Sequence, residues 1–262
     1  MNIAETTFST LARKPPLYLI SHERSGTHLA INLCFRNLYI RQAFHDFSHW
    51  TGPYENPLDA SAHWQSVARR WPEILTAGGV VKSHCEAEVW RRFLPKTNVL
   101  YVLRDPRDTL VSFFHYLNRD EFHCNNPGRE TLRSGSFQEF LRRPLDDFLQ
   151  LGFSIEGGAA NVAERWAKHV RGWLDMPGIV VLRYESLLSD YRTCMYQVAS
   201  RVRIWPKLKM SPYSFGEKGA ILPRKGVVGD WSEYFSEEDL DFLRVAMQKW
   251  SVDPGDWKFP SS

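Results

Sequence analysis

The 262-residue chain is 43% hydrophobic and 14% aromatic, which is typical of a globular protein and excludes a disordered or fibrous one. Its 33 Lys and Arg against 30 Asp and Glu give a formal net charge of +3, too small to indicate binding of nucleic acid by charge alone. No apolar run approaches the roughly 18 residues of a membrane span, and the first residues lack the apolar stretch of a signal peptide. We therefore predict one cytoplasmic domain, residues 1–262, without a membrane or nucleic-acid partner.

Four short, nearly continuous apolar runs predict the β-strands. They lie at residues 17–20, 80–82, 99–103 and 179–182. Such runs are typical of strands buried on both faces of a parallel sheet, because a half-buried strand alternates apolar and polar residues. Between them, helical patterns occupy residues 27–40, 58–71, 86–94 and 106–119. The alternation predicts a single α/β domain in which helices flank a parallel sheet through right-handed crossovers.

Two more helices and three long loops complete the predicted layout. One helical stripe holds Val162, Trp166, Val170 and Trp173, and the other holds Leu240, Leu243, Met247 and Trp250. The second of these helices begins with Ser236 and has Asp239 three residues later, close to a capping box. Gly- and Asn-bearing stretches at 120–136 and 152–160, and the segment 208–230, predict long loops, which in a compact domain are often functional.

The cysteines predict reduced thiols and no metal site. Cys34, Cys85, Cys124 and Cys194 stand 51, 39 and 70 residues apart, so the sequence has no CxxC pair and no zinc-binding spacing. His84 stands beside Cys85, but adjacent side chains on a strand point to opposite faces of the sheet.

The segment 21–28, which reads SHERSGTH, joins the first predicted strand to the first helix. A small-residue turn at a helix N-terminus presents free backbone N–H groups and the positive end of the helix dipole, so it favours a bound phosphate or sulfate. It is not a Walker A loop, because no GxxxxGKS or GxxxxGKT string occurs in the chain. The alternative is that Ser25 or Thr27 only caps the helix.

Arg104 lies at the carboxyl end of the third predicted strand. An arginine there is positioned to reach a ligand held by the first loop. A Walker B strand ends instead in an aspartate that binds magnesium, so this strand end argues against a metal-dependent kinase. The alternative is an ordinary helix start with Pro106 in its first turn.

Two later segments add positive charge and glycine. Arg183-Tyr184-Glu185 follows the fourth strand, and residues 224–231 read RKGVVGDW. Arg224 and Lys225 before Gly226 are suited to a second phosphate, because the glycine lets the backbone approach closely. Taken alone, the pair is also typical of a solvated surface patch.

In this order, the segments resemble the sulfotransferases that use 3′-phosphoadenosine 5′-phosphosulfate (PAPS). Residues 23–27 are similar to that family's 5′-phosphosulfate loop, and residues 101–112 with His115 are similar to its 3′-phosphate motif. Lys82-Ser83-His84 is similar to the strand end that carries the family's catalytic histidine. Segments 183–185 and 224–231 match two more of its motifs, so the resemblance extends from about residue 17 to residue 250. It implies the P-loop nucleotide-kinase-like sulfotransferase fold.

The resemblance implies PAPS as co-substrate, the bisphosphate nucleotide PAP as product and no metal. His84 is the expected general base, with Lys82 and Arg24 beside the transferring group. The residues expected around the 5′-phosphosulfate are Arg24, Ser25, Gly26, Thr27 and His28. Those expected around the 3′-phosphate are Arg104, Ser112, Arg224, Lys225 and Gly226, with Tyr184 near the adenine.

Two residues depart from the family's pattern. Leu29 stands where many cytosolic members place a tryptophan that stacks on adenine, and Ser232 stands where a lysine often follows Gly-Asp-Trp. Both departures favour a microbial or divergent member. Two other classes stay open, a small-molecule kinase with a degenerate loop and a nucleotide-binding protein without turnover.

We predict a small apolar or aromatic acceptor with a hydroxyl group; an amine stays open, as does homo-oligomerisation. Aromatic residues in the segments expected to border the site favour such a ligand. They are Phe44, Phe47, Trp50, Phe113, Phe114, Tyr116, Phe122, Phe148 and Phe153. The helical ones, Phe113 and Phe114, are at least as typical of a core.

Overall fold

A parallel sheet of five strands lies at the centre of the computed structural model, which describes residues 16–47, 78–93, 98–125, 130–147, 158–212 and 226–257. The strands are β1 (Leu17–Ser21), β2 (Phe44–Phe47), β3 (Val80–Ser83), β4 (Val99–Leu103) and β5 (Val180–Arg183). Their order across the sheet is β2-β3-β1-β4-β5, and each neighbouring pair is parallel. The predicted parallel α/β architecture is therefore confirmed, and its four predicted strands agree with the observed ones to within one residue.

Strand β2 is the difference, because the sequence analysis assigned no strand to Phe44–Phe47. It lies at one edge of the sheet and pairs with β3 alone, with Phe44 opposite Val80. Its sequence, FHDF, places two polar residues between two phenylalanines and so lacks the continuous apolar character of the four predicted runs.

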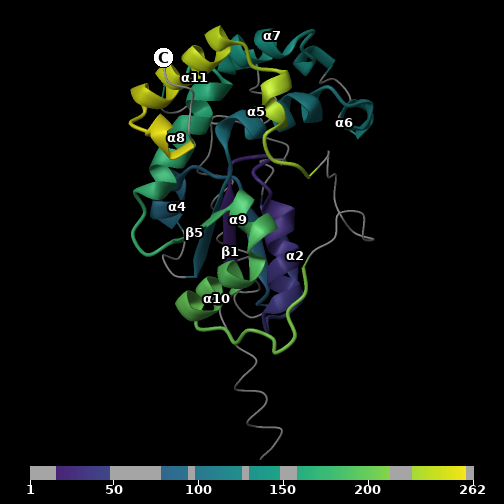
Figure 1. The fold of residues 1–262 in the computed structure, drawn as a ribbon, viewed down its shortest axis with the longest axis vertical. Coiled ribbons are helices and arrows are strands. Elements are labelled where there is room, and N and C mark those ends of the chain that lie inside the picture. Colours follow the sequence, from purple (N-terminus) through teal and green to yellow (C-terminus); the bar gives the residue numbers. More distant parts are fainter. Residues whose placement is uncertain are drawn as a thin grey trace, which may run out of the picture.

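One face of the sheet is covered by α2 (Thr27–Asn37), α9 (Tyr184–Ser189) and α10 (Tyr191–Val202), which lie side by side in Figure 1. The core on this face is mostly aliphatic. β1 contributes Leu17 and Leu19, and α2 contributes Leu33, all at most 1% exposed. Because alternate residues of a strand point to opposite faces, Tyr18 and Ile20 are directed to the other side of the sheet.

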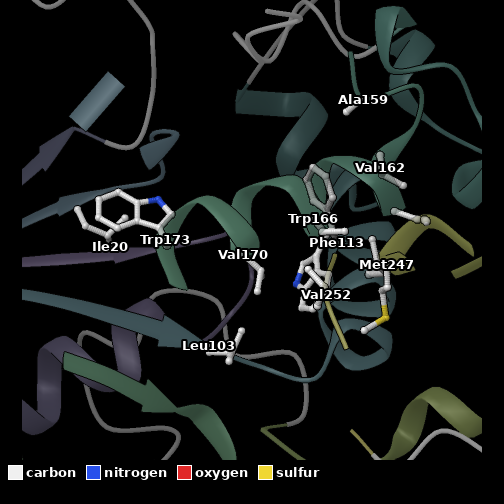
Figure 2. Close-up of a cluster of buried hydrophobic side chains, with 14 of the residues drawn as sticks. Ile20, Leu103, Phe113, Ala159, Val162, Trp166, Val170, Trp173, Met247 and Val252 are labelled. Carbon is white, nitrogen blue, oxygen red and sulfur yellow. The ribbon is translucent and has the colours of Figure 1, made fainter. Parts of the chain in front are cut away.

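The opposite face is covered by α4 (Ala87–Phe93), α5 (Pro106–Leu117) and α8 (Val162–Leu174), with α7 (Phe137–Arg142) and α11 (Glu237–Lys249) beyond them (Figure 1). Aromatic side chains are frequent in this core. Figure 2 shows Trp173 near Ile20 at one end of α8, and Trp166 toward its other end. The rings of Trp173 and Tyr101 stack with centroids 5.7 Å apart and planes 12° from parallel.

Two predicted segments need correction. The first helix was predicted to run to residue 40 but ends at Asn37, whose side-chain amide donates to the carbonyls of Leu33 at 2.9 Å and Ser211 at 3.1 Å. The chain then turns extended, and Leu38 forms an antiparallel bridge with Pro206. The segment 120–136, predicted as a loop, contains α6 (Asp120–Asn125) and the short 3₁₀ helix η1 (Glu130–Leu132).

Other predicted segments lie partly or wholly outside the described residues. The predicted helix 58–71 is wholly outside, and the predicted loops 152–160 and 208–230 are described only at 158–160, 208–212 and 226–230. The last of these ends at η3 (Asp230–Glu233), and the described chain ends with η4 (Pro254–Trp257). Among the described helices, none has the length and apolar character needed to cross a bilayer.

The predicted capping box at the start of α11 is confirmed. The Ser236 hydroxyl accepts from the backbone N–H of Asp239 at 3.2 Å, and the Asp239 carboxylate accepts from the backbone N–H of Ser236 at 3.0 Å. Arg142 of α7 also donates to this buried carboxylate, which ties α7 to α11. These contacts fix the outer helix layer above α8.

Candidate functional site

Polar residues gather where β1, β3, β4 and β5 end. Ser21 closes β1, His84 follows β3, Arg104 follows β4 and Tyr184 follows β5. All four are buried, with at most 8% of each residue exposed. Because parallel strands end at the same edge of a sheet, these side chains meet in one place, which is where ligands bind in open α/β folds.

The loop between β1 and α2 has its carbonyl groups turned to donors within the protein. The Ser21 carbonyl accepts from Nδ1 of His84 at 2.7 Å, and the Glu23 carbonyl accepts from Nδ1 of His22 at 3.0 Å. The His22 carbonyl accepts from the Ser25 N–H at 3.3 Å, and the Arg24 carbonyl accepts from Arg104 at 3.1 Å. Carbonyl oxygens repel anions, so this arrangement suits the loop to a negatively charged ligand.

The start of α2 has no side-chain cap. Its N-cap is Gly26, which has no side chain, and the Thr27 hydroxyl lies 2.6 Å from the Ser21 hydroxyl instead. The alternative in which Ser25 or Thr27 merely caps the helix is therefore not what the structure shows. The first-turn N–H groups and the positive end of the helix dipole, which the sequence analysis predicts to bind the anion, therefore have no side chain competing for them at the N-cap.

Gly26 is required by two features of the loop. Its φ is 93°, in the left-handed region that favours glycine, and a Cβ there would lie 2.2 Å from the ring of Tyr184. The preceding Arg24 also has a positive φ, 64°, which a non-glycine residue adopts only when its surroundings impose it. The guanidinium of Arg104 lies over the Tyr184 ring, with its Cζ 4.3 Å from the ring centroid.

His84 and Lys82 stand beside this loop. The Ser21 carbonyl can only accept, so His84 Nδ1 carries a proton, and the neutral imidazole has its unprotonated nitrogen at Nε2. Lys82, only 5% exposed, has its ammonium 3.4 Å from Nε2 of His28 in the first turn of α2. The structure thus brings together the predicted base, the predicted lysine and the anion loop.

Arg24 reaches the helix that follows β4. Its Nε donates to the Ser112 hydroxyl of α5 at 3.3 Å, and its guanidinium lies 4.9 Å from the Tyr116 ring centroid. Arg24 was assigned to the 5′-phosphosulfate and Ser112 to the 3′-phosphate, so this contact joins the two predicted halves of the site.

Arg104 links the first loop to the segment after residue 226. It donates to the carbonyls of Arg24 and, at 3.2 Å, Val227, while its own Nε is buried and has no hydrogen-bond partner among the described residues. Gly226 has a φ of 69°, and Gly229 donates its N–H to Asp108 at 2.9 Å. Burial raises the pKa of that Asp108 carboxyl. Predicted residues Arg224 and Lys225 lie outside the described residues.

The sequence analysis missed a set of buried polar residues behind the loop. Arg165 of α8 forms a two-point ion pair with Glu23, at 2.7 and 2.8 Å, and also donates to His22 Nε2 at 2.9 Å. Farther back, His169 Nδ1 lies 3.0 Å from the Tyr101 hydroxyl. One signal was available, since an acidic residue in an anion loop needs a buried cation beside it.

The aromatic residues expected to form an acceptor wall divide into groups. Phe113 and Phe122 are core residues, 2% and 5% exposed. Phe44 is 41% exposed, and its ring centroid lies 6.3 Å from that of His28, so it borders the predicted site. Phe114 and Tyr116 are half-buried and pack at the edge of the aromatic core. Phe47 lies on β2, whereas Trp50, Phe148 and Phe153 lie outside the described residues.

The chain resembles known sulfotransferases. The model of the sulfotransferase domain family matches residues 14–201. The 3-alpha-hydroxysteroid sulfotransferase of Cavia porcellus is 27% identical over 217 residues, which are 68% of this chain and 69% of that protein. The amine sulfotransferase of Oryctolagus cuniculus is 25% identical over 185 residues, 59% of this chain and 54% of that protein.

Solved structures show the same fold. The mouse sulfotransferase SULT7A1, crystallised with PAP, superimposes with a TM-score of 0.58 at 17% identity, over 92% of this chain and 86% of its own. The sulfotransferase from Alicyclobacillus acidocaldarius gives a TM-score of 0.52 at 14% identity, over 94% of this chain and 99% of its own. At such identities the likeness concerns the arrangement of strands and helices.

Proposed function

The chain belongs to the sulfotransferase domain family, and on that premise we propose that it transfers a sulfuryl group from PAPS to a hydroxyl or amine of a small apolar or aromatic acceptor. One observation carries the proposal. His84, the proposed base, donates from Nδ1 to the Ser21 carbonyl of the anion loop, so the base and the loop form one unit. An acceptor beside His84 is then also beside the loop's anion.

The residues present fit PAPS, which supplies an activated sulfuryl group with PAP as its leaving group. We assign the 5′-phosphosulfate to the loop, residues 24–28, and the 3′-phosphate to Arg104, Ser112 and Gly226, with Arg224 and Lys225 joining from outside the described residues. The buried, unpartnered Nε of Arg104 supports this assignment, because a buried charged donor is costly to leave without an acceptor. Tyr184 borders the nucleotide in this proposal.

In the proposed reaction His84 Nε2 takes the proton of the acceptor as its oxygen or nitrogen attacks. An imidazole suits this role near neutral pH, since its ordinary pKa is about 6.5. Negative charge grows on the leaving group during transfer, and Lys82, Arg24 and the N-terminus of α2 are fixed donors that stabilise it there. These donors are in place before the reaction, so they lower the barrier without reorganising.

The experiment that tests the proposal combines binding and turnover. Thermal unfolding is measured with PAP, with ATP and magnesium, and in buffer; PAP alone is expected to raise Tm, because a ligand of the native state stabilises it. Turnover of PAPS with a panel of acceptors, followed by mass spectrometry, is expected to persist in excess EDTA. Stabilisation by ATP with strict magnesium dependence would favour the kinase alternative, and PAP binding without any turnover would favour a binding protein.

The acceptor class is supported by Phe44 beside His28 and by the relatives, whose names specify a hydroxysteroid and an amine. We expect phenols, aliphatic alcohols or amines to accept sulfate faster than heparan-type saccharides or acidic tyrosine peptides. A competition assay among these acceptors decides the point, and preference for the saccharide or the peptide would contradict it. A single domain over residues 1–262, a cytoplasmic location and metal-free catalysis are parts of the same proposal.

A further inference from the structure

Glu23 is an unexpected residue in a loop proposed to bind an anion. It directly precedes Arg24 and its side chain is only 17% exposed. A carboxylate at this position repels the 5′-phosphosulfate unless its charge is cancelled nearby. The loop is therefore competent only if another part of the fold supplies a cation.

Arg165 supplies that cation from α8, a helix distant in sequence. Its two terminal nitrogens donate to the two Glu23 oxygens at 2.7 and 2.8 Å, a bidentate pair that fixes direction as well as distance. Burial raises the pKa of Glu23, but the charge and hydrogen bonds of Arg165, together with the nearby His22 and His84, outweigh burial and hold that pKa well below its usual range. The carboxyl is therefore ionised at neutral pH, and its charge is matched.

His22 extends the ion pair to the backbone of the loop. Its Nε2 accepts from Arg165 at 2.9 Å, and its Nδ1 donates to the Glu23 carbonyl at 3.0 Å. Burial lowers the pKa of His22 to about 3, so the ring is neutral and holds both bonds. Arg165 thus holds the Glu23 side chain directly and the Glu23 backbone carbonyl through His22. The next residue in the chain is Arg24, which has the positive φ.

We propose that Arg165 and Glu23 are positioning residues for the donor: their buried ion pair holds the loop in its anion-binding conformation and cancels the one negative charge within it. The inference rests on the proposed function, because it needs PAPS or PAP in the loop. It assigns no contact with the reacting atoms to either residue.

The test compares two nucleotides that differ only at the loop. PAP places a 5′-phosphate there, whereas adenosine 3′-monophosphate does not. Arg165→Met leaves the Glu23 charge uncompensated, so affinity for PAP is expected to fall about ten-fold or more by calorimetry, with adenosine 3′-monophosphate much less affected. A merely structural role would weaken both nucleotides alike. Arg171→Met, which removes an exposed ion pair with Asp175 on the same helix, is the matched control and should change neither affinity.

The double variant Glu23→Gln/Arg165→Met removes both charges and is expected to recover the part of the PAP affinity that the uncompensated charge costs, but not the part that depends on the ion pair holding the loop. It also carries the test if Arg165→Met does not fold, since it leaves no unpaired buried charge. Equal weakening of both nucleotides in the double variant, or unchanged PAP affinity in Arg165→Met, overturns the inference. Failure of the unsubstituted protein to bind PAP overturns the proposed function instead.

Discussion

The two faces of the sheet are covered by cores of different composition and have different relations to the proposed site. The face under α2 and α10 is aliphatic, and it supports a helix whose N-terminal backbone is the proposed anion site. The face under α8 packs aromatic rings and contains buried charges and imidazoles, among them Arg165 and His169. The α2 face thus carries the loop, and Arg165 on the α8 face contacts the loop through its ion pair with Glu23. Substitutions on the two faces should therefore have different consequences.

The largest effect is expected at the edge where the two faces meet. His84→Ala should lower turnover about 10²- to 10⁴-fold, because it removes the proposed proton acceptor, while PAP affinity stays close to that of the unsubstituted protein. Tm should fall modestly, since the Ser21 carbonyl loses its imidazole donor. Steady-state kinetics with parallel calorimetry measure this. Near-normal turnover would assign the base to another group, such as Glu86, whose pKa is raised by burial, or to an acceptor that ionises unaided.

Stability measurements sharpen the comparison of the faces themselves. Trp173→Ala should lower the free energy of unfolding by about 3 to 5 kcal/mol, since it opens a large cavity and leaves the Cys85 carbonyl without the indole N–H, now 3.0 Å away. Leu33→Ala, at a buried position on the α2 face, should lower the free energy of unfolding somewhat less, by about 2 to 5 kcal/mol, because it opens a cavity without removing a hydrogen bond. Chemical denaturation measures both, and a greater loss in the leucine variant would place the main stabilising core on the aliphatic face.

Arg104→Ala should weaken PAP binding by about ten-fold or more, because a buried charged hydrogen bond contributes roughly 1.5 to 3 kcal/mol. Arg201→Ala, which removes an exposed arginine of α10, is the control and should leave the affinity unchanged. Binding of adenosine 5′-monophosphate as tightly as PAP by the unsubstituted protein would exclude recognition of the 3′-phosphate.

The smallest effect is expected in the outer layer of the α8 face. Ser236→Ala breaks the capping box of α11 and should lower the free energy of unfolding by about 1 kcal/mol, with PAP affinity intact. Ser200→Ala changes an exposed serine inside α10 and should cause no loss. A change in donor affinity upon uncapping would show that the outer helices also position the site, contrary to the division proposed here.

Much of the fold was predictable because four of the five strands have apolar runs, and three of them, β1, β3 and β4, are buried on both faces. Continuous apolar runs identify β1, β3, β4 and the edge strand β5, whereas β2, at the opposite edge, has a mixed sequence that carries no such signal. The end of α2 depends on the Asn37 side chain meeting Ser211, far away in sequence. Periodicity alone does not contain that contact.

The site divides in the same way. Gly26, His84 and Arg104 were predictable because they lie in local motifs next to strands. Arg165 was not, because its burial depends on Glu23, which is 142 residues away, and a helical pattern assigns an arginine to the solvent face. The assignments of these residues to donor and acceptor stay predictions until the variants are measured.

The position of β1 has a consequence for how the chain folds during synthesis. β1 is the first described strand in the sequence but the middle one in the sheet, with β3 on one side and β4 on the other. Synthesis from Ser21 to Leu103 takes roughly 4 to 16 s at ordinary ribosomal rates. Throughout that interval an apolar strand emerges without both of its partners, which favours aggregation of the nascent chain. Slower production at low temperature, with chaperones in excess, is therefore expected to raise the yield of folded protein.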